Sequence, residues 1–316
     1  MRIETNKLDK KNKIILAHLM TNCRTPTTKL AKISNLSQPS IVYRIKNLEK
    51  NNFISKYDVL LNYNKFPLKF NVFMITIPQK KEKEFEKYCQ TNKNIMSAVK
   101  CINNYNYSLT TFTTKKEINK IITYLEKEKL HYTNFNEIKS YFQTLTIFDI
   151  PIKIKKTNHN NETIKLDKND IKILETLSNG GAKDSILKIS KKTKIPIDIV
   201  LYRYKKLKKA NYLKNYIAQI NPTKFHLNYT IILFKTKNIT QNQSLNKIKN
   251  LKKSIWIGQI NENEYLITIV FKDYKEYLEI LNKIYNNFEN KITKLETFPI
   301  KNWIFLNRIN LTQILK

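Results

Sequence analysis

The stretch NLSQPSIVYRIKNLEK, residues 35–50, gathers side chains that can form hydrogen bonds with the edges of DNA bases. Gln38 and Asn47 carry amide groups that can pair with adenine, and the guanidinium group of Arg44 can reach guanine or a phosphate. In a helix these side chains lie opposite the apolar residues Ile41, Ile45 and Leu48. That polar face carries Gln38, Ser40, Tyr43, Arg44 and Asn47. The pattern predicts a helix that contacts bases.

Two of these side chains have a structural interpretation as well. Arg44 can instead pair with Glu49 or another neighbouring carboxylate, and both interpretations stay open. Tyr43 and its counterpart Tyr202 later in the chain fit packing or a phosphate contact as well as a base contact. The residue types alone therefore do not assign these positions to base recognition.

A second stretch, IPIDIVLYRYKKLKKANYLK (residues 195–214), has the same pattern with different side chains. It begins with Ile197 and Asp198, and the carboxylate of Asp198 would repel phosphate. It continues with Lys205, Lys206, Lys208, Lys209 and Lys214. We expect an asymmetric reader, in which the first stretch supplies specificity and the second supplies salt-dependent affinity. The alternative is a second copy that has become a dimerisation scaffold.

The residues predicted to contact DNA come from both stretches and from the segment after the first. They are Ser37, Gln38, Ser40, Tyr43, Arg44, Asn47, Lys56, Tyr202, Arg203, Lys205, Lys206 and Lys209.

The two stretches belong to a longer internal repeat. LDKKNKIILAHL, from Leu8, returns as LDKNDIKILETL, from Leu166, and residues 28–57 align with residues 187–216. Arg44 falls on Arg203, Leu48 on Leu207 and Tyr57 on Tyr216; further on, Tyr107 falls on Tyr265. Self-similarity over about half the chain indicates a duplicated architecture.

The first part of each copy is predicted to be helical. Leu8, Ile15, Leu16 and Leu19 recur at a helical period, and Leu30, Ala31 and Ile33 mark a second helix. Ser37 is a good N-cap for the third helix, with Pro39 in its first turn. Asn52 and Asn211 stand where a left-handed residue would end that helix. Three short helices of this kind make a helix-turn-helix, and the alternating FISKYDVLLNY that follows predicts a hairpin wing.

The second part of each copy predicts a βαββαβ order, which is the ferredoxin-like arrangement. In the first copy the elements are LKFNVFMITIP, QKKEKEFEKYCQTN, IMSAVKCIN, YSLTTFTT, KKEINKIITYLEKEKL and EIKSYFQTLTIF. The fifth is an amphipathic helix with Ile118, Ile121, Ile122 and Leu125 on one face. The second copy repeats the order through YTIILFKT, SLNKIKNLKKS, IWIGQI, YLITIVF, YKEYLEILNKIY and LETFPIKNWIFL.

Composition narrows the class of partner. The chain has 316 residues, and 58 Lys and Arg against 25 Asp and Glu give a formal charge of +33. A compositional bias toward Lys, Asn and Ile would not explain the deficit of acids, so we expect double-stranded DNA as the partner. Three glycines leave no phosphate-cradling loop, and the three cysteines and four histidines have no metal-ligand spacing. We expect no cofactor and no metal. With no signal peptide and no membrane span, the protein is expected to be cytoplasmic.

The tandem pattern resembles the Lrp/AsnC family of feast/famine transcription regulators. LD...N.IIL..L, Leu30–Ala31, Leu36–Ser37, RI..LE from Arg44 and FISKY follow in the family's order and spacing. The second copy keeps LD..D..IL, Arg203 and Leu207 but departs at IP and Lys208. The resemblance implies that the ferredoxin-like modules pair, here within one chain, and that two helix-turn-helix units bind DNA about one helical turn apart. Further homo-oligomerisation stays open.

The same resemblance implies a small-molecule effector such as an amino acid, with its site near the second hairpin of each module. The family usually carries a Gly and an Asp there. The positions are Asn103 and Asn106 in the first copy, and Asn261 and Glu264 in the second. Loss of the glycine changes the backbone options, and loss of the Asp in the first copy removes a charge that would hold an amino group. Both departures argue against amino-acid sensing.

Two other functions compete with regulation. Sirohaem decarboxylases share the two-part architecture but place histidine and arginine around that hairpin, where CINNYNYSL and QINENEYLI have neither. We therefore name no catalytic residue and expect no enzyme. An architectural protein that coats DNA without reading it fits the charge, but the intact first helix-turn-helix favours specificity.

The sequence thus predicts an α+β chain with two winged helix-turn-helix domains and two βαββαβ ferredoxin-like domains in tandem. The predicted boundaries are 1–64 and 65–151 for the first copy, 152–164 for a linker, and 165–223 and 224–316 for the second copy. The predicted function is a sequence-specific transcriptional regulator that acts as an intramolecular pseudo-dimer.

Overall fold

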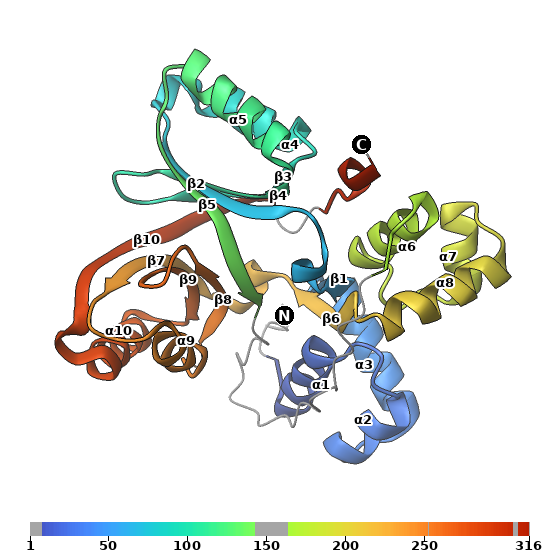
Figure 1. The fold of residues 1–316 in the computed structure, drawn as a ribbon. Coiled ribbons are helices and arrows are strands. Elements are labelled where there is room, and N and C mark those ends of the chain that lie inside the picture. Colours follow the sequence, from blue (N-terminus) through green and yellow to red (C-terminus); the bar gives the residue numbers. More distant parts are fainter. Residues whose placement is uncertain (1–7, 143–163, 252, 306–308, 316) are drawn as a thin grey trace. The chain divides into compact units, whose positions relative to one another are not determined.

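The computed structural model describes residues 8–142, 164–251, 253–305 and 309–315 (Figure 1). These residues form two compact units, and each unit combines parts of both copies. The first contains residues 8–62 and 164–226, and the second contains residues 63–142 and 227–315 with the same gaps. Residues 152–163 of the predicted linker lie outside the described ranges. The mixed α+β class predicted from the sequence is confirmed.

The first unit holds both sets of three helices. Their bounds are α1 Lys10–Thr21, α2 Thr27–Ser34 and α3 Gln38–Lys50 in the first copy, and α6 Lys168–Ser178, α7 Ile186–Thr193 and α8 Ile197–Lys209 in the second. The face of α3 predicted to be apolar is buried at Ile41, Ile45 and Leu48. Asn52 and Asn211 have φ angles of 58° and 59°, so the prediction of a left-handed residue after the third helix is confirmed in both copies.

The hairpin wing predicted after the third helix is wrong. Residues Ile54–Leu61 form one continuous strand, β1, and its antiparallel partner is β6, Leu213–Ile220, from the other copy. Residues 54–61 contain no glycine or proline, and their open edge pairs with the equivalent strand of the other copy. Tyr57 stands opposite Ala218, and Val59 stands opposite Tyr216.

The two helix-turn-helix units also exchange backbone contacts beyond this ribbon. Cys23 N–H, just after α1, donates to the carbonyl oxygen of Tyr216 at 2.7 Å. At the equivalent place in the second copy, Ala182 N–H donates to the carbonyl oxygen of Tyr57 at 3.0 Å. Each copy therefore uses the loop after its first helix to hold the strand of the other, which gives the unit a pseudo-two-fold arrangement.

The second unit is a closed barrel in the strand order β10-β3-β4-β2-β5-β8-β9-β7. The strands of the first copy are β2 Lys69–Thr76, β3 Ile95–Cys101, β4 Tyr107–Thr113 and β5 His131–Phe142. Those of the second copy are β7 Asn228–Thr236, β8 Ser254–Gln259, β9 Glu264–Phe271 and β10 Ile292–Phe305. The helices are α4 Glu82–Thr91 and α5 Lys115–Lys127 in the first copy, and α9 Gln241–Lys249 and α10 Tyr274–Phe288 in the second.

The last strand of each copy joins the two modules of the barrel. β5 pairs with β2 of its own copy and then, from Lys139 to Phe142, with β8 of the other copy. β10 pairs with β7 of its own copy and then, from Ile300 to Phe305, with β3 of the other copy. β5 begins at His131, earlier than the EIKSYFQTLTIF segment predicted for it, whose residues 143–148 lie outside the described part of the chain.

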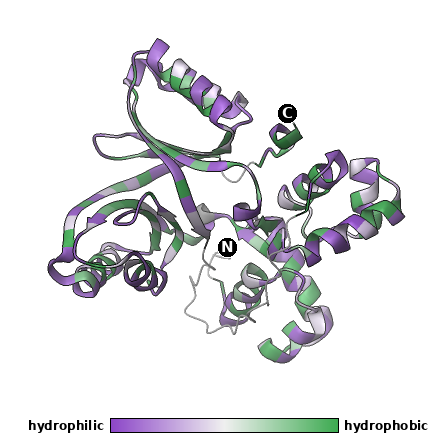
Figure 2. Cartoon of the chain, viewed as in Figure 1, coloured by the Kyte–Doolittle hydropathy of each residue, from purple (hydrophilic) through white to green (hydrophobic). Residues whose placement is uncertain are grey.

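Each module has its own apolar core between helices and strands. In the first copy, Ile118, Ile121 and Leu125 of α5 are buried against Phe73 and Tyr107 of the strands. Along α5 hydrophilic and hydrophobic residues both recur, as its amphipathic sequence predicts (Figure 2). The second copy builds the equivalent core from α9, α10 and strands β7 to β9.

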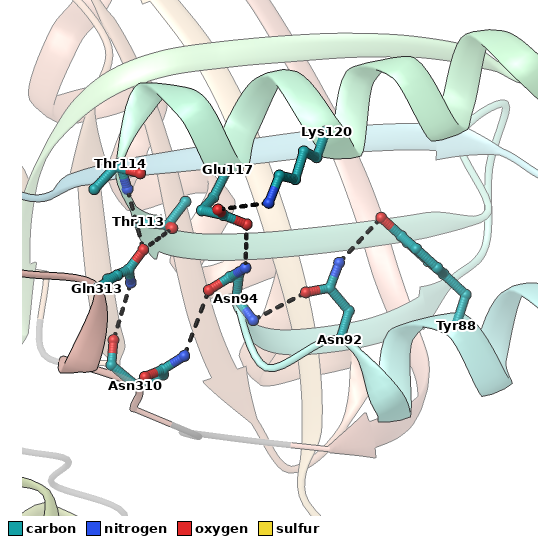
Figure 3. A network of polar contacts seen from close by, with 9 residues as sticks. All are labelled: Tyr88, Asn92, Asn94, Thr113, Thr114, Glu117, Lys120, Asn310 and Gln313. Carbon is teal, nitrogen blue, oxygen red and sulfur yellow. Dashed lines mark hydrogen bonds and ion pairs between the residues drawn. The ribbon is translucent and has the colours of Figure 1, made fainter. Parts of the chain in front are cut away.

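The described C-terminal residues bind the first module through Gln313 (Figure 3). The Gln313 amide oxygen accepts from Thr113 Oγ1 and from Thr114 N–H, the latter at 3.3 Å. The Gln313 amide nitrogen donates to the carbonyl oxygens of Phe112 at 3.1 Å and Asn310 at 2.9 Å. Gln313 is 8% exposed, so this end of the second copy is part of the barrel unit.

The role of Gln313 follows from how the two modules cap their last helix. In the second copy, the Glu276 carboxylate of α10 accepts from the backbone N–H of Lys272 at 2.6 Å. In the first copy, the corresponding Glu117 of α5 bonds Asn94 instead, at 2.7 Å (Figure 3). Gln313 accepts instead from the N–H of Thr114, the N-cap of α5, so the C-terminal segment supplies an acceptor at the start of this helix.

Replacing Gln313 by alanine should lower the free energy of unfolding of the barrel unit by about 1–3 kcal/mol, because Thr113 and Thr114 lose their buried acceptor. Urea unfolding followed by circular dichroism would measure the change. Leu315→Ala is the matched control, since Leu315 is in the same segment and 44% exposed. Equal stability of Gln313→Ala and Leu315→Ala would contradict this role.

Candidate nucleic-acid interface

Helix α3 is fixed at its start by the residues that the sequence indicated. The Ser37 side chain accepts from the backbone N–H of Ser40 at 3.4 Å, and Pro39 lies in the first turn. Burial of the apolar face leaves the opposite side open, and Tyr43 there is 67% exposed. The Gln38 amide nitrogen donates to Thr27 Oγ1 at 2.9 Å, so α2 orients the Gln38 side chain at the tip of α3.

The other predicted contacts of α3 differ in exposure. Ser37, Gln38 and Tyr43 are exposed, whereas Ser40, Arg44 and Asn47 are half-buried. Lys46 and Lys50 are also exposed on this helix. The tip and the solvent side of α3 therefore expose one amide, one phenol and two ammonium groups.

Arg44 pairs with an acid, as its structural interpretation required. Its guanidinium donates to Asp9 at 2.6 Å and to the side-chain oxygen of Asn12 at 3.0 Å. Burial alone would raise the pKa of Asp9, but hydrogen bonds from Asn12 N–H and Arg44 lower it below its ordinary value. Asp9 is also the N-cap of α1, so Arg44 ties α3 to the start of α1. A contact of Arg44 with DNA stays a prediction.

Arg203 repeats this arrangement with one more charge. It donates to Asp167, the N-cap of α6, at 2.6 Å and to Asp170 at 3.0 Å. Asp170 is fully buried and replaces the neutral Asn12 of the first copy. The alignment of Arg44 with Arg203 thus follows from a shared structural contact.

Helix α8 presents lysines along its second half. Lys205 and Lys209 are exposed and Lys206 is half-buried, and no salt bridge within the described residues engages them. Tyr202 is 67% exposed, the same fraction as Tyr43 on α3. These three ammonium groups are free to meet phosphate.

Lys56 is held in an ion pair next to the ribbon of β1 and β6. Its ammonium lies 2.9 Å from Asp58, whose side chain is 3% exposed. Asp58 also accepts from Gln219 Nε2 at 2.7 Å and from the backbone N–H of Gly180 at 2.8 Å. Gly180 has a φ of 101°, a backbone that favours glycine, so Asp58 anchors a turn of the second copy to a strand of the first.

Asp58 gives this junction a pH dependence. Burial raises the pKa of Asp58 above its ordinary value, although Lys56 and the Gly180 N–H oppose the shift. Because the pKa of Asp58 is higher in the folded state than in the unfolded state, protonation of Asp58 favours folding. This stabilisation is fully present below the unfolded-state pKa and is lost as pH rises through the folded-state pKa. Relative to Asp58→Asn, the wild-type protein should gain stability in urea unfolding as pH falls from neutral toward the ordinary Asp pKa of 3.8. Parallel pH profiles for the two proteins would contradict this.

Sequence reasoning missed a pair of cations that join the two copies. The guanidinium carbon of Arg24 lies 4.2 Å from the ring centroid of Tyr216 on β6, and Arg24 donates to the Tyr204 hydroxyl at 2.7 Å. At the equivalent position, the Lys183 ammonium lies 3.7 Å from the ring centroid of Tyr57 on β1. Each cation stabilises the strand of the other copy through its aromatic ring.

Burial and a neighbouring acid act on the pKa of Lys183 in opposite directions. Burial lowers the pKa of Lys183, and Glu49 at 3.6 Å opposes that shift. Burial also raises the pKa of Tyr57, whose hydroxyl donates to Glu49. No local signal in the sequence marks Arg24 or Lys183, because their partners are strands of the other copy.

The candidate effector residues of the barrel unit bond to nearby backbone and side chains. The Asn106 amide accepts from Ile77 N–H at 2.7 Å and donates to Ile77 O at 2.8 Å. The Asn103 amide donates to Thr297 O at 3.0 Å, and Asn261 donates to Glu264 at 3.0 Å. These contacts hold the hairpins in shape, and effector binding at the four residues stays a prediction.

One histidine lies beside the first of these hairpins although the sequence around the hairpin has none. The rings of His131 and Tyr105 are stacked with centroids 5.7 Å apart, and the Tyr105 hydroxyl bonds Thr133 Oγ1 at 2.6 Å. Pairing of β2 with β5 brings His131 there, so the linear sequence could not indicate it. Within the described ranges, no three His, Cys, Asp or Glu residues form a group that could hold a metal ion. In the same ranges no helix has the length and apolarity that a membrane span needs.

The two sets of three helices and the β1–β6 ribbon that joins them define a protein of the helix-turn-helix class with an α+β fold. Residues 8–49 match the AsnC-type helix-turn-helix domain, so the chain carries a domain of this type at its N-terminus. The resemblance to Lrp/AsnC regulators predicted from the sequence is confirmed over this segment.

Curated relatives match a longer stretch of the chain than this domain does. Over 80 residues the chain is 36% identical to the HTH-type transcriptional regulator LrpA of Pyrococcus abyssi (strain GE5 / Orsay). The matched stretch covers 25% of this chain and 55% of that protein. It is 35% identical over 80 residues to LrpA of Pyrococcus horikoshii, with the same coverage. The chain spans about half the length of the curated relatives it matches.

A solved structure resembles the whole chain in fold. The siroheme decarboxylase NirDL, in co-complex with an iron-uroporphyrin III analogue, gives a TM-score of 0.64 and covers 95% of this chain and 94% of that chain. Sequence identity is 11%, so the likeness concerns the fold alone. It extends over both copies of the repeat.

Proposed function

We propose that this protein is a sequence-specific DNA-binding transcriptional regulator of the Lrp/AsnC type, acting as an intramolecular pseudo-dimer. The observation that carries the proposal is the antiparallel pairing of β1 with β6, which holds two helix-turn-helix units in one compact body. Regulators of this kind bind DNA through two such units. Here one chain supplies both.

The contacts around the ribbon support a fixed spacing between the units. Arg24 and Lys183 each form a cation–π contact with a tyrosine of the other copy. Asp58 accepts a hydrogen bond from the backbone N–H of Gly180 in the other copy. A fixed spacing is what a two-part operator requires, since half-sites must lie about one helical turn apart, roughly 34–36 Å. Inserting half a turn of DNA between the half-sites should therefore weaken binding.

The division of labour between the units follows from their side chains. Both helices expose lysines at equivalent positions, Lys46 and Lys50 on α3 and Lys205 and Lys209 on α8. They differ in that α3 has the amides Gln38 and Asn47 where α8 has Ile197 and Lys206. Amide groups distinguish base edges, and ammonium groups bind phosphate without regard to sequence. The first unit supplies specificity and the second supplies salt-dependent affinity.

The direct test is binding of the full chain to its own upstream region and to a shuffled duplex of equal composition. Fluorescence anisotropy across a salt series would compare the two. We expect the natural sequence to bind at least about a hundredfold tighter and to stay bound at moderate salt. Equal and steeply salt-dependent binding to both duplexes, and to duplexes selected from a random pool, would contradict a regulator and favour a coating protein.

The fold likeness to NirDL sets a control for this experiment. Purified protein that carried a haem-like absorbance band would favour an enzyme over a regulator. The residues at the two hairpins do not support that function, because residues 101–109 and 259–267 contain neither histidine nor arginine. His131, beside Tyr105, is the residue to replace if such a band appears.

A further inference from the structure

The N-terminal tip of α8 is apolar where the tip of α3 is polar. Ile197, Ile199 and Leu201 are 43%, 39% and 39% exposed. By the alignment of the two copies, Ile197 and Ile199 stand where α3 has Gln38 and Ser40. Ile197 and Leu201, one turn apart, lie on one side of the first turns of α8, and Ile199 lies on the other side. Val42, the α3 counterpart of Leu201, is 38% exposed, so the two helix tips differ at Ile197 and Ile199.

The change is coordinated with the neighbouring helix. In the first copy, Gln38 at the tip of α3 bonds Thr27 at the start of α2. In the second copy, the equivalent residues are Ile197 and Ile186, so both members of the polar pair are replaced by isoleucine. The next residue, Leu187, is 53% exposed. The helices keep their places while the hydrogen-bonding groups are lost.

Positive charge on α8 and on the end of α7 indicates the kind of partner. Lys205 and Lys209 follow it on α8, and Lys191 and Lys194 lie at the end of α7; all four are exposed. Among the described residues nearby, Asp198 is the acid at the tip itself. An apolar protein or lipid tail would bring no charge to balance these lysines, whereas DNA does.

Within the major groove, the apolar group that a helix can contact is the methyl group of thymine. Hydrogen-bond donors and acceptors mark the other base edges, and aliphatic side chains leave those groups unpaired. Ile197, Ile199 and Leu201 offer no hydrogen bond and match a methyl surface. Contact with thymine is therefore the base recognition that this helix tip can perform.

We propose that α8 recognises thymine methyl groups in one half of the operator through Ile197, Ile199 and Leu201. This inference rests on the proposed regulator function and refines its second unit. The two half-sites then differ in kind: one is read by hydrogen bonds from α3, and the other by apolar contact from α8. The operator is asymmetric, with thymines at set positions under α8.

The test compares thymine with deoxyuridine, which lacks only the 5-methyl group. Duplexes bound by the full chain are first selected from a random pool, and each half-site is assigned with Gln38→Ala, which should relax choice in one half alone. Thymines are then replaced by deoxyuridine in one half-site at a time. We expect affinity to fall about fourfold for each contacted methyl group under α8 and to fall less under α3, where Val42 is exposed but Gln38 and Ser40 replace Ile197 and Ile199.

The matched variant carries Ile197→Gln and Ile199→Ser, the residues found on α3. Both positions are exposed, so the fold should survive, and the variant should lose its response to deoxyuridine under α8. Specific binding without any half-site difference between thymine and deoxyuridine would overturn this inference and leave the regulator standing. Failure to select any sequence would overturn both. A change in self-association of the variant, seen by sedimentation with an unaltered deoxyuridine response, would instead assign the tip to a second copy of the chain and overturn the inference.

Discussion

Arg203→Met should lower the free energy of unfolding of the helix-turn-helix unit by about 3–5 kcal/mol, whereas Arg44→Met should cost about 1 kcal/mol or less. The two arginines occupy equivalent positions and make equivalent contacts. The difference lies in the acids. The Asp170 side chain is 1% exposed, and without Arg203 its carboxylate keeps its burial and loses its counter-charge. Asp9 is 49% exposed, so water solvates it when Arg44 is removed.

A double-mutant cycle tests this cause directly. Asp170→Asn introduces the residue type that the first copy has at the equivalent position, Asn12. Arg203→Met with Asp170→Asn should therefore recover most of the stability that Arg203→Met loses, because no buried charge remains. Urea unfolding of the four proteins at neutral pH would measure the coupling. If both single arginine variants lost the same amount, or if Asp170→Asn gave no recovery, the buried charge would not be the cause.

Stability and DNA binding of the Arg44→Met variant, measured together, separate the two interpretations of Arg44. A purely structural Arg44 gives a variant with slightly lower stability and unchanged choice of DNA sequence. An Arg44 that leaves Asp9 to bind guanine gives a variant whose sequence preference changes at one position. Because the Asp9 pair is exposed, its replacement by a guanine contact would cost little.

Local features of the fold were predictable from the sequence because their causes are local. Ser37 caps α3, Ile41 and Leu48 are buried at a helical period, and Asn52 and Asn211 take the left-handed conformation. Each depends on residues within a turn or two of chain, where residue type and spacing determine the outcome. The repeat extended these predictions to the second copy.

Contacts between the copies could not be predicted in the same way. The alternation of β1 predicts a strand but does not name its partner, and a hairpin was predicted where β6 pairs instead. The carboxylate partner of Arg44 is Asp9, 35 residues earlier in the chain. Gln313 bonds Thr113, which lies 200 residues before it. Such partners depend on tertiary packing, which side-chain periodicity does not record.

Replacing Lys205, Lys206 and Lys209 together by alanine should weaken binding to every duplex alike, by at least about tenfold at physiological salt. Each lost phosphate contact lowers the magnitude of the slope of log affinity against log salt by about 0.9, so the slope should fall by about 2.7. Alanine is the best helix former, so α8 should remain intact. The expected signature is a uniform loss of affinity with unchanged sequence preference.

A charge-matched control shows whether position or total charge matters. The barrel unit exposes Lys83 and Lys87 on α4 and Lys116 on α5. Their replacement by alanine also removes three positive charges. If α8 binds phosphate, this control should change affinity far less than the α8 variant does. Equal effects of the two triple variants would mean that net charge alone drives binding, as in a coating protein.

The companion change is Gln38→Ala, which removes an amide from α3 and leaves the charge untouched. Its expected effect is the reverse: relaxed sequence choice with an unchanged salt slope, because a base contact is lost and no phosphate contact is. Competition binding against a panel of single-base variants would separate the two signatures. If the lysine variant altered sequence preference more than affinity, or Gln38→Ala altered the salt slope, the assignment of base hydrogen bonding to α3 and of phosphate binding to the lysines of α8 would be wrong.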